Sequence, residues 1–534
     1  KLAGDDPDAP HMKNAREAIL ESGGAACANV FTRITLALFG QVPWRAVPFI
    51  PVEIMLLPRW FPFHIRKVSY WSRTVMVPLF VLCSLKPKAA NPGEVDIREL
   101  FVTPPEKERN YFPARSVLNR VFFWLDRAGR MIEPLVPPFV RRRAVRAAAD
   151  FVIERLNGED GLGGIFPAMV NAHEMLAVIG YPGDHPYRIY TRRALEKLLV
   201  VTSDRAYCQP CLSPVWDTGL ACLTVQEATR DGDNEAVLKG LDWLKPLQLL
   251  SEPGDWQWQR PNLRGGGWAF EFRNDHYPDI DDTPVVAWAM LQSGKMRYRE
   301  SVERAAEWIC GMQSINGGLG SFDVNNTHYY MNDIPFADHG ALLDPPTSDV
   351  TARCVTFLSR LDRERFRPTI DAAIEFLKSE QEQQGCWFGR WGTNFIYGTW
   401  SVLIALEAAG ESLEQSYIRR AVNWLKRVQR EDGGWGEGNI TYFEPERAGC
   451  HTHSTSFQTA WALLGLMAAG EVRSESVSAG VDYLMRTQRG DGLWREPDFT
   501  APGFPRVFYL KYHGYSRYFP LWALARYRTL TDAR

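Results

Sequence analysis

A pattern that recurs through the second half of the chain limits the fold more than any other feature. Each copy has an aromatic residue and Leu, then Gln, then Gly, then Trp, at fixed spacing. Full copies begin at Phe376, Trp424 and Tyr483, a fourth from Trp308 has Leu319 in the Trp place, and looser ones begin at Trp243 (with Gln248 and Trp256) and Phe151. Single units of this size cannot bury a core, so neighbouring units must stack or close into a ring. No segment of β period stands out, and we therefore expect an all-α toroid or barrel of helix pairs.

The repeat also predicts local contacts. The Gln amide can serve open backbone groups at a neighbouring helix end, and the Trp indole can stack nearby. The chain has 534 residues, enough for two large domains. Its 19 Trp, 19 Tyr and 28 Phe either brace such repeats or line a cavity. The net charge of −2 gives nucleic-acid binding no electrostatic support.

An acidic segment, Asp279-Ile-Asp281-Asp282-Thr283-Pro284, precedes an apolar stretch. Thr283 is a good N-cap and Pro284 a good first residue, so we expect a helix to begin there. Clustered carboxylates with little solvent cannot all ionise, so one should keep its proton. Beside an apolar, aromatic cavity, such an acid suits protonation of a hydrocarbon double bond. The alternative is a solvated acidic turn.

Cysteine and histidine give weaker signals. The nine Cys residues are scattered, which favours reduced thiols and a protein on the cytosolic side. Cys208 and Cys211 form an isolated C-x-x-C, more typical of core or turn cysteines than of a metal site. The tract Cys450-His451-Thr452-His453 looks like a ligand cluster, but one short tract of this kind is more often a polar loop. Phosphate-binding and dinucleotide-binding motifs are absent, and we predict no cofactor and no metal.

Residues 121–143 are strongly apolar and aromatic, and end in Arg141-Arg142-Arg143. This combination is typical of a surface that enters a membrane without crossing it, although a core helix with a solvated basic end fits equally well. No apolar run is long enough to span a bilayer. The chain starts at Lys1 without Met, so we expect a native N-terminal piece to precede it.

Taken together, these motifs resemble the squalene–hopene cyclase family of class II triterpene cyclases. The repeats resemble its QW motifs, and Asp279–Thr283 matches its D-x-D-D-T acid motif. The resemblance runs over the whole chain, supported by the segments 213–219, 267–270 and 503–512. It implies two α/α-barrel domains that enclose a central apolar cavity. Residues 1–211 would form the second barrel with the membrane-dipping segment, its opening part missing, and residues 212–534 the α6–α6 barrel with the acid motif.

The resemblance also implies an activity. Family members polycyclise squalene to hopene or hopanol without a cofactor, as monotopic membrane proteins that are commonly homodimers. A class II cyclase for another polyprenyl substrate is one alternative. A non-catalytic, membrane-bound helical toroid is another, and the intact acid motif argues against it.

By similarity, Asp281 is the proton donor and Asp279 and Asp282 are its carboxylate neighbours. The family pattern often has His where this chain has Arg353, four residues after Asp349. We hypothesise that Arg353 is the cationic partner of Asp281, directly or through water. The alternative is a structural pair of Arg353 with Asp349.

The resemblance further implies a lining that stabilises cations, although any single aromatic could be plain core. Its members would be Trp71, Trp216, Phe270, Phe322, Trp391, Tyr397, Phe504, Phe508, Tyr512 and Tyr515. Ile165 and Pro167 lie in the segment that would help to hold the final water. Phe166 and Glu271 stand where Gln is common, which leaves the ratio of hopene to hopanol open.

Overall fold

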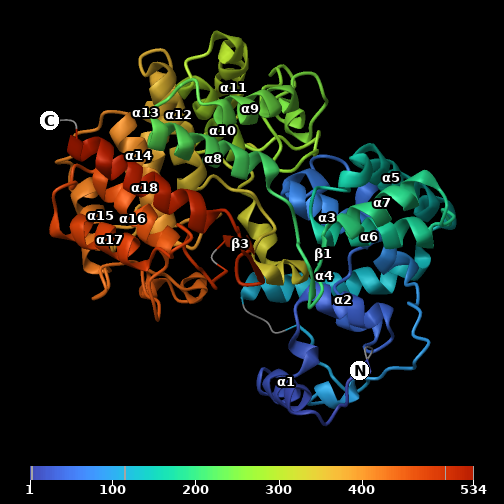
Figure 1. The fold of residues 1–534 in the computed structure, drawn as a ribbon. Helices are drawn as coiled ribbons and strands as arrows, with labels where there is room; N and C mark the ends of the chain where they lie inside the picture. The colour runs from blue at the N-terminus through green and yellow to red at the C-terminus, as the bar shows by residue number, and fades with distance from the viewer. Residues whose placement is uncertain (2–3, 113–115, 500, 533–534) are drawn as a thin grey trace. The chain divides into compact units, whose positions relative to one another are not determined.

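The computed structural model describes residues 1, 4–112, 116–499 and 501–532 (Figure 1). It divides into two compact units. Unit 1 comprises residues 1–197 and 328–343, and unit 2 comprises residues 198–327 and 344–534. Residues 328–343 therefore lie between two parts of unit 2 in the sequence but belong to unit 1. The predicted domain boundary between residues 211 and 212 stays a prediction.

Unit 1 is built around one helix that is buried on all sides. Its helices are α1 (Pro10–Glu21), α2 (Val30–Leu38), α3 (Tyr70–Leu85), α4 (Val117–Ile132), α5 (Pro138–Glu154), α6 (Phe166–Val178) and α7 (Pro186–Lys197). Every residue of α3 except Leu85 is buried. The Ser69 side chain caps α3 by accepting from the Ser72 N–H at 3.2 Å. Helices α5 and α6 pack against α3, so α3 forms the core of this unit.

Unit 2 is a closed double ring of helices. Its elements are β1 (Leu199–Val201), β2 (Ala206–Cys208), α8 (Pro214–Thr229), α9 (Glu235–Leu244), α10 (Asp282–Gln292), α11 (Arg299–Gly311), α12 (Ser348–Asp362), α13 (Arg367–Ser379), α14 (Phe395–Ala408), α15 (Ser416–Arg427), α16 (Ser456–Ala468), α17 (Glu475–Thr487), β3 (Ala501–Phe504), β4 (Phe508–Leu510) and α18 (Tyr515–Asp532). The helices α8, α10, α12, α14, α16 and α18 each pack on the next, and α18 returns to α8. They form the inner ring, and α9, α11, α13, α15 and α17 form the described part of the outer ring (Figure 1). The all-α toroid prediction is confirmed.

Burial separates the two rings. The inner helices α14 and α16 are apolar and buried over nearly their whole length. The outer helix α15 is amphipathic, with a buried stripe that includes Ile418, Val422 and Leu425 and an exposed charged face. A helix buried all round belongs in the middle of a domain, and an amphipathic one belongs at its surface. The hydrophobic pattern thus assigns each helix to its ring.

Two short antiparallel hairpins depart from the all-helical expectation. Strands β1 and β2 pair before α8, and β3 pairs with β4 before α18. The second hairpin has an irregular register between Pro502 and Phe504. Strands of three or four residues are too short to leave a period-2 pattern in the sequence, which explains why they were not predicted.

The repeat residues hold each outer helix to the next. The amide of Gln429 donates to Gly433 O at 2.8 Å and to Ser476 O, in the first turn of α17, at 2.9 Å. The indole N–H of Trp435 donates to Leu425 O, in the last turn of α15, at 2.8 Å. This carbonyl lacks a partner within the helix, so the indole satisfies it. The predicted role of Gln is confirmed, and Trp has a hydrogen-bonding role in addition to packing.

The looser copy differs from its prediction. The Trp that serves the end of α9 is Trp268, which donates to Leu244 O at 2.7 Å, rather than Trp256. Gln248 keeps its role and donates to Gly266 O and Ser301 O. The chain inserts an extra loop between Gln and Trp here, so fixed spacing gave the wrong residue.

Replacing Gln429 by Leu should lower the unfolding midpoint of unit 2. The substitution leaves two carbonyl groups without their donor, which costs about 1–3 kcal/mol per buried group. The matched control is Gln488→Leu, because Gln488 donates only to Gly492 O among the described residues and is exposed. Denaturant unfolding followed by circular dichroism checks the difference. Equal losses in the two variants would contradict the bridging role.

Candidate active site

The acid motif lies at the start of the inner helix α10. This helix begins at Asp282, with Asp281 as its N-cap residue, so the prediction of Thr283 as N-cap was wrong. The Thr283 hydroxyl instead donates back to Asp279 O and accepts from Trp268 N–H at 3.1 Å. The motif is thereby fixed to the loop of the neighbouring repeat. The carboxylates of Asp279, Asp281 and Asp282 are all buried, so they do not form the solvated turn that the sequence left open.

Asp281 forms a two-pronged ion pair with Arg353. The guanidinium Nε donates to Oδ1, and Nη2 donates to Oδ2 at 3.0 Å. Arg353 projects from α12, which packs beside α10 in the inner ring. Asp349, one turn earlier on α12, accepts instead from the backbone N–H groups of Arg390 and Trp391 at 2.8 and 2.9 Å. Of the two arrangements considered from the sequence, the structure has Arg353 against Asp281.

The three carboxyl groups have unequal proton affinities. Burial, together with the nearby Asp281 and Asp279 charges, raises the pKa values of Asp279 and Asp282 well above the ordinary range. Burial also raises the pKa of Asp281, but the Arg353 cation opposes the rise. Asp281 is therefore the strongest acid of the three.

Replacing Asp282 by Asn should stabilise the protein more at pH 8 than at pH 4. The pKa of Asp282 is 3.8 when unfolded and raised well above that when folded. A raised pKa contributes stability below about pH 3.8 that is lost as pH rises towards the folded value. Asn does not ionise and removes this loss. Thermal unfolding at both pH values measures it, and a stability difference independent of pH would contradict the raised pKa.

Arg353 is held by two further groups on α14. Its Nη2 donates to Tyr397 Oη at 2.6 Å, and its Nη1 donates to Ser401 Oγ at 3.3 Å. Its guanidinium carbon also lies 5.2 Å from the ring centroid of Trp216. Burial lowers the pKa of Arg353, but the charge and hydrogen bond of Asp281, with Tyr397 and Asp349, together outweigh this and raise it overall. Arg353 therefore stays positively charged, and its guanidinium is held in one orientation against Asp281.

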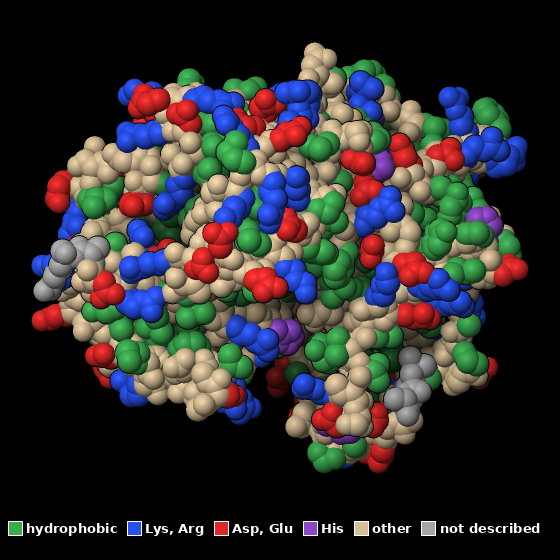
Figure 2. Space-filling model, turned by 45° about the horizontal axis from the view of Figure 1, so that its top comes forward, with side chains coloured by type: hydrophobic (Ala, Val, Ile, Leu, Met, Phe, Trp, Pro, Cys, Tyr) green, Lys and Arg blue, Asp and Glu red, His purple; other side chains and the backbone are tan. Residues whose placement is uncertain are grey.

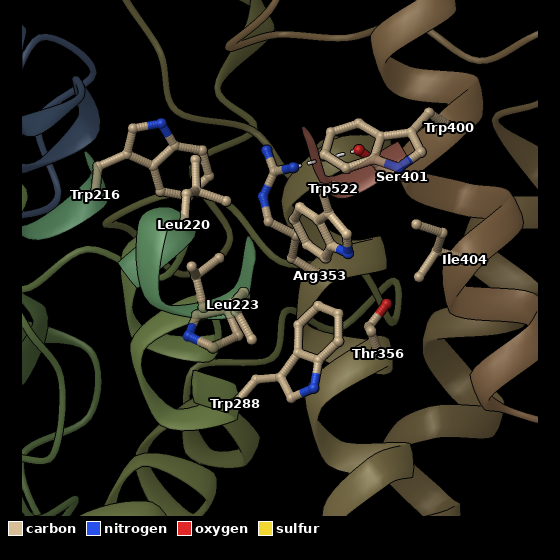
Figure 3. A pocket seen from close by; sticks show the side chains of 12 residues that line it. Trp216, Leu220, Leu223, Trp288, Arg353, Thr356, Trp400, Ser401, Ile404 and Trp522 are labelled. Carbon is tan, nitrogen blue, oxygen red and sulfur yellow. Dashed lines mark hydrogen bonds between the residues drawn. The ribbon is translucent and has the colours of Figure 1, made fainter. Parts of the chain in front are cut away.

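The guanidinium reaches the wall of a cavity inside the ring, shown in Figure 3. The cavity has a volume of about 30 Å³. It is lined by Trp216, Leu220, Leu223, Pro284, Val285, Trp288, Arg353, Thr356, Trp400, Ser401, Ile404 and Trp522. Sites for drug-sized ligands measure roughly 300–1,000 Å³, so this cavity has room for water but not for a long hydrocarbon.

Several of the predicted aromatic residues of unit 2 meet. Tyr512 and Tyr515 stack with centroids 4.6 Å apart, and Phe270 meets Tyr512 edge-on at 6.3 Å. The indole N–H of Trp216 donates to Tyr515 Oη at 3.0 Å. Since Trp216 and Tyr397 both lie near Arg353, this group extends to the acid.

Other predicted residues of unit 2 lie in separate contacts. Phe504 and Phe508 face each other across the β3–β4 hairpin, 5.1 Å apart. The indole N–H of Trp391 donates to Ser321 Oγ at 2.6 Å. The backbone N–H of the neighbouring residue, Phe322, donates to the buried carboxylate of Asp344 at 2.7 Å. These contacts position Trp391 and Phe322 through one short loop.

Three predicted residues belong to unit 1. Trp71 is buried in α3, and its indole N–H donates to Ala341 O at 2.6 Å. Ile165 is the N-cap residue of α6, and Pro167 lies in the first turn of that helix. Their predicted part in the lining stays a prediction.

Sequence reasoning missed an aromatic group behind Tyr397. Trp461 lies 4.8 Å from Tyr397 and 5.5 Å from Phe519, centroid to centroid. It also stacks on Trp400 at 5.9 Å and meets Phe457 edge-on at 5.2 Å. A signal existed in the spacing of Phe457 and Trp461, four residues apart on one buried helix face.

A closed ring of helices with a buried D-x-D-D cluster at the start of an inner helix defines a class II terpene cyclase. The family model described as "Squalene-hopene cyclase C-terminal domain" matches residues 212–529, and the model for the N-terminal domain matches residues 1–204. The chain belongs to the squalene–hopene cyclase family.

Named relatives agree with this assignment. The chain is 52% identical to "Squalene--hopene cyclase" from Zymomonas mobilis, covering 100% of this chain and 82% of the relative. It is 40% identical to the protein of that name from Alicyclobacillus acidocaldarius, covering 100% and 84%. It is also similar to "Dammaradiene synthase" from Dryopteris crassirhizoma, at 37% identity over 99% of this chain and 81% of that protein.

Proposed function

We propose that this protein cyclises squalene to hopene, with Asp281 as the proton donor. The observation that carries the proposal is the buried Asp281–Arg353 pair beside two carboxyls, Asp279 and Asp282, whose pKa values burial raises. The names and identities of the relatives support squalene as the substrate. An alkene is a very weak base, so the acid must be strong and yet protonated before reaction. Burial raises the pKa of Asp281 and so favours its protonated form, and Arg353 stabilises the carboxylate after the proton has left.

The proton step conserves every atom. The O–H bond of Asp281 breaks as a C–H bond forms at the terminal alkene of squalene, and the electron pair of the O–H bond stays on the carboxylate. Each following step converts a carbon–carbon π bond into a σ bond and moves the cation along the chain. Loss of a proton from the last cation gives hopene, and capture of water gives hopanol. The reaction needs no oxidant or reductant.

Aromatic faces of unit 2 stabilise the moving cation. A well-placed ring contributes roughly 0.5–2 kcal/mol. Trp216 lies beside Arg353 and connects through Tyr515 to Tyr512 and Phe270, so this group can serve the first cation. Tyr397 fixes Arg353 itself. Phe322, Trp391, Phe504 and Phe508 serve later cations, as the family positions imply.

Incubation of the detergent-solubilised protein with squalene tests the proposal. Gas chromatography–mass spectrometry should detect a pentacyclic C30 hydrocarbon, with or without the alcohol. Conversion of geranylgeranyl diphosphate or another polyprenyl substrate in its place would support the alternative substrate class. A folded protein that converts neither would contradict the proposal.

We further propose that unit 1 docks on a membrane through α4. The docking face consists of the exposed apolar side chains of this helix and of the segment that follows it. Val117, Val121, Trp124, Leu125, Met131 and Ile132 of α4 are exposed, as are Leu135 and Phe139 beyond it. Arg142, Arg143 and Arg146 are exposed on the next helix, where they can attract anionic lipid. Among the described residues, no helix is both long and apolar enough to cross a membrane. An apolar face of this extent beside arginines is typical of an interfacial helix.

Replacing Trp124 by Glu should weaken binding to anionic vesicles about tenfold or more, because a large ring is 71% exposed on the docking face. Ile315→Glu is the matched control, since Ile315 is even more exposed, at 92%, but lies in unit 2. Co-sedimentation with phosphatidylglycerol vesicles measures both variants. Equal loss in both would exclude α4 as the docking face.

We also propose the cytoplasmic side of the membrane and a homodimer. The nine cysteines, all within the described residues, are free thiols, which supports a reducing compartment. Light scattering of the detergent-solubilised protein tests the homodimer, and a monomeric mass would exclude it.

Charge on the face shown in Figure 2 is mixed, with acidic and basic side chains interspersed.

A further inference from the structure

Two histidines and an aspartate converge on the surface of unit 2, away from the acid motif. His451 and His453 lie in the loop before α16, and Asp498 lies between α17 and β3. The Nε2 of His453 is 2.6 Å from Asp498 Oδ2, and the Nε2 of His451 is 3.7 Å from Oδ1. The two imidazole centroids are 4.4 Å apart. One potential ligand atom from each residue thus lies within 4.8 Å of the others.

The spacing suits a small divalent ion. A tetrahedral zinc ion with bonds of about 2.0–2.1 Å keeps its ligand atoms ~3.3 Å apart. The observed 2.6 and 3.7 Å, each to a different oxygen of Asp498, lie on either side of this value, and the three ligand atoms lie within 4.8 Å of one another, so shifts of roughly 1–2 Å would complete the geometry. The side chain of His453 is 47% exposed, so little packing opposes such a shift.

The surrounding groups already fix the two segments. The Arg430 guanidinium donates to the carbonyls of His451 and Thr452, at 2.6 and 3.0 Å. Thr452 Oγ1 lies 3.1 Å from His453 Nδ1. When Nε2 gives up its proton to bind a metal ion, the Nδ1–H can donate to this Thr452 oxygen as an outer partner. The amide of Asn439 donates to Phe499 O at 2.6 Å, which secures the other segment beside Asp498.

An ion pair alone accounts for only part of this arrangement. It explains the contact of His453 with Asp498, but it does not require a second imidazole against the first. Both Nε2 atoms face the same carboxylate, one at each oxygen. Two imidazoles and a carboxylate are the donor set of zinc, cobalt and nickel ions, rather than of magnesium or calcium.

We propose that His451, His453 and Asp498 bind a divalent transition metal ion of the zinc class, with a fourth position open to water. The ion would join the loop before α16 to the segment that enters the β3–β4 hairpin. Phe504 and Phe508 lie in that hairpin, so the metal would secure the base of the element that carries them. The site does not depend on the proposed cyclase chemistry.

Titration with ZnCl2 against a chromogenic chelator tests the site on untagged, EDTA-treated protein in detergent. The native chain should bind one more equivalent than His451→Ala, His453→Ala or Asp498→Asn. Loss of a direct ligand should weaken affinity by at least about 100-fold, because loss of an outer partner alone weakens it 10–100-fold. Co²⁺ should give visible d–d absorption of a low-symmetry site in the native chain and not in the variants.

Two matched variants sharpen the test. His11→Ala removes an exposed histidine of unit 1 and should leave binding unchanged, as should Cys450→Ser in the same loop. Near-ultraviolet circular dichroism confirms that each variant is folded. Equal stoichiometry and affinity in the native chain and in a variant that combines His451→Ala, His453→Ala and Asp498→Asn would overturn the proposal. Loss of binding in Cys450→Ser, or displacement of Co²⁺ by Mg²⁺, would overturn the ligand set or the metal class.

Discussion

An Asp281→Asn protein should form no detectable pentacyclic product from squalene, with activity lower by at least about 10⁴-fold. Asn has no acidic proton, and among the three carboxyls only Asp281 has a cation to stabilise its conjugate base. The remaining pair, Asp279 and Asp282, has pKa values raised well above the ordinary range. Those groups are too weak as acids to protonate an alkene. Product analysis by gas chromatography–mass spectrometry measures the loss.

The control for this variant must separate chemistry from folding. Asn at position 281 leaves the buried Arg353 without its carboxylate, at a cost of about 3–5 kcal/mol. A double variant, Asp281→Asn with Arg353→Met, removes both charges and should regain stability while staying inactive. Asp275→Asn changes a surface carboxylate in the same loop, paired with Arg273 at 2.8 Å, and should stay active. A folded Asp281→Asn protein that still cyclises squalene would remove Asp281 as the acid.

The ring of helices in unit 2 could be predicted from the sequence because the repeated Gln and Trp residues make specific hydrogen bonds. Gln429 and Trp435 each satisfy backbone groups at helix ends, so their spacing is fixed by helix geometry. The start of α10 was misplaced because Thr283 bonds backward to Asp279 instead of capping the helix. This arrangement of the Thr283 hydroxyl depends on the backbone N–H of Trp268, which comes near Thr283 only after folding. Local capping preferences could not anticipate it.

The acid site was predictable in part. The crowding of carboxylates at Asp281 is visible in the sequence, but its partner Arg353 lies 72 residues away and came only from the family pattern. No family pattern marked Trp461 and Phe519, and the four-residue spacing of Phe457 and Trp461 was the one local signal. In a chain with 12% aromatic residues, most rings are core, and only the folded ring of helices shows which ones approach Tyr397.

Replacing Arg353 by Lys should lower kcat by about 10–100-fold, the equivalent of one lost charge-assisted hydrogen bond. The ammonium of Lys can approach one oxygen of Asp281 but cannot reproduce the fork that contacts both and also reaches Tyr397. The conjugate base of Asp281 is then less well stabilised as the proton leaves. Single-turnover kinetics with squalene measure the change in the chemical step. Full activity in Arg353→Lys would contradict a role for the fork.

An Arg353→His variant adds a test of the charge itself. Arg stays protonated at all working pH values, whereas an imidazole has an ordinary pKa near 6.5. Stabilisation by His is therefore present at low pH and lost as pH rises through its pKa. The ratio of kcat for Arg353→His to native kcat, measured from pH 5 to 8, should fall with rising pH. A ratio that stays constant would show that Asp281 needs a hydrogen-bond donor at this position but no positive charge.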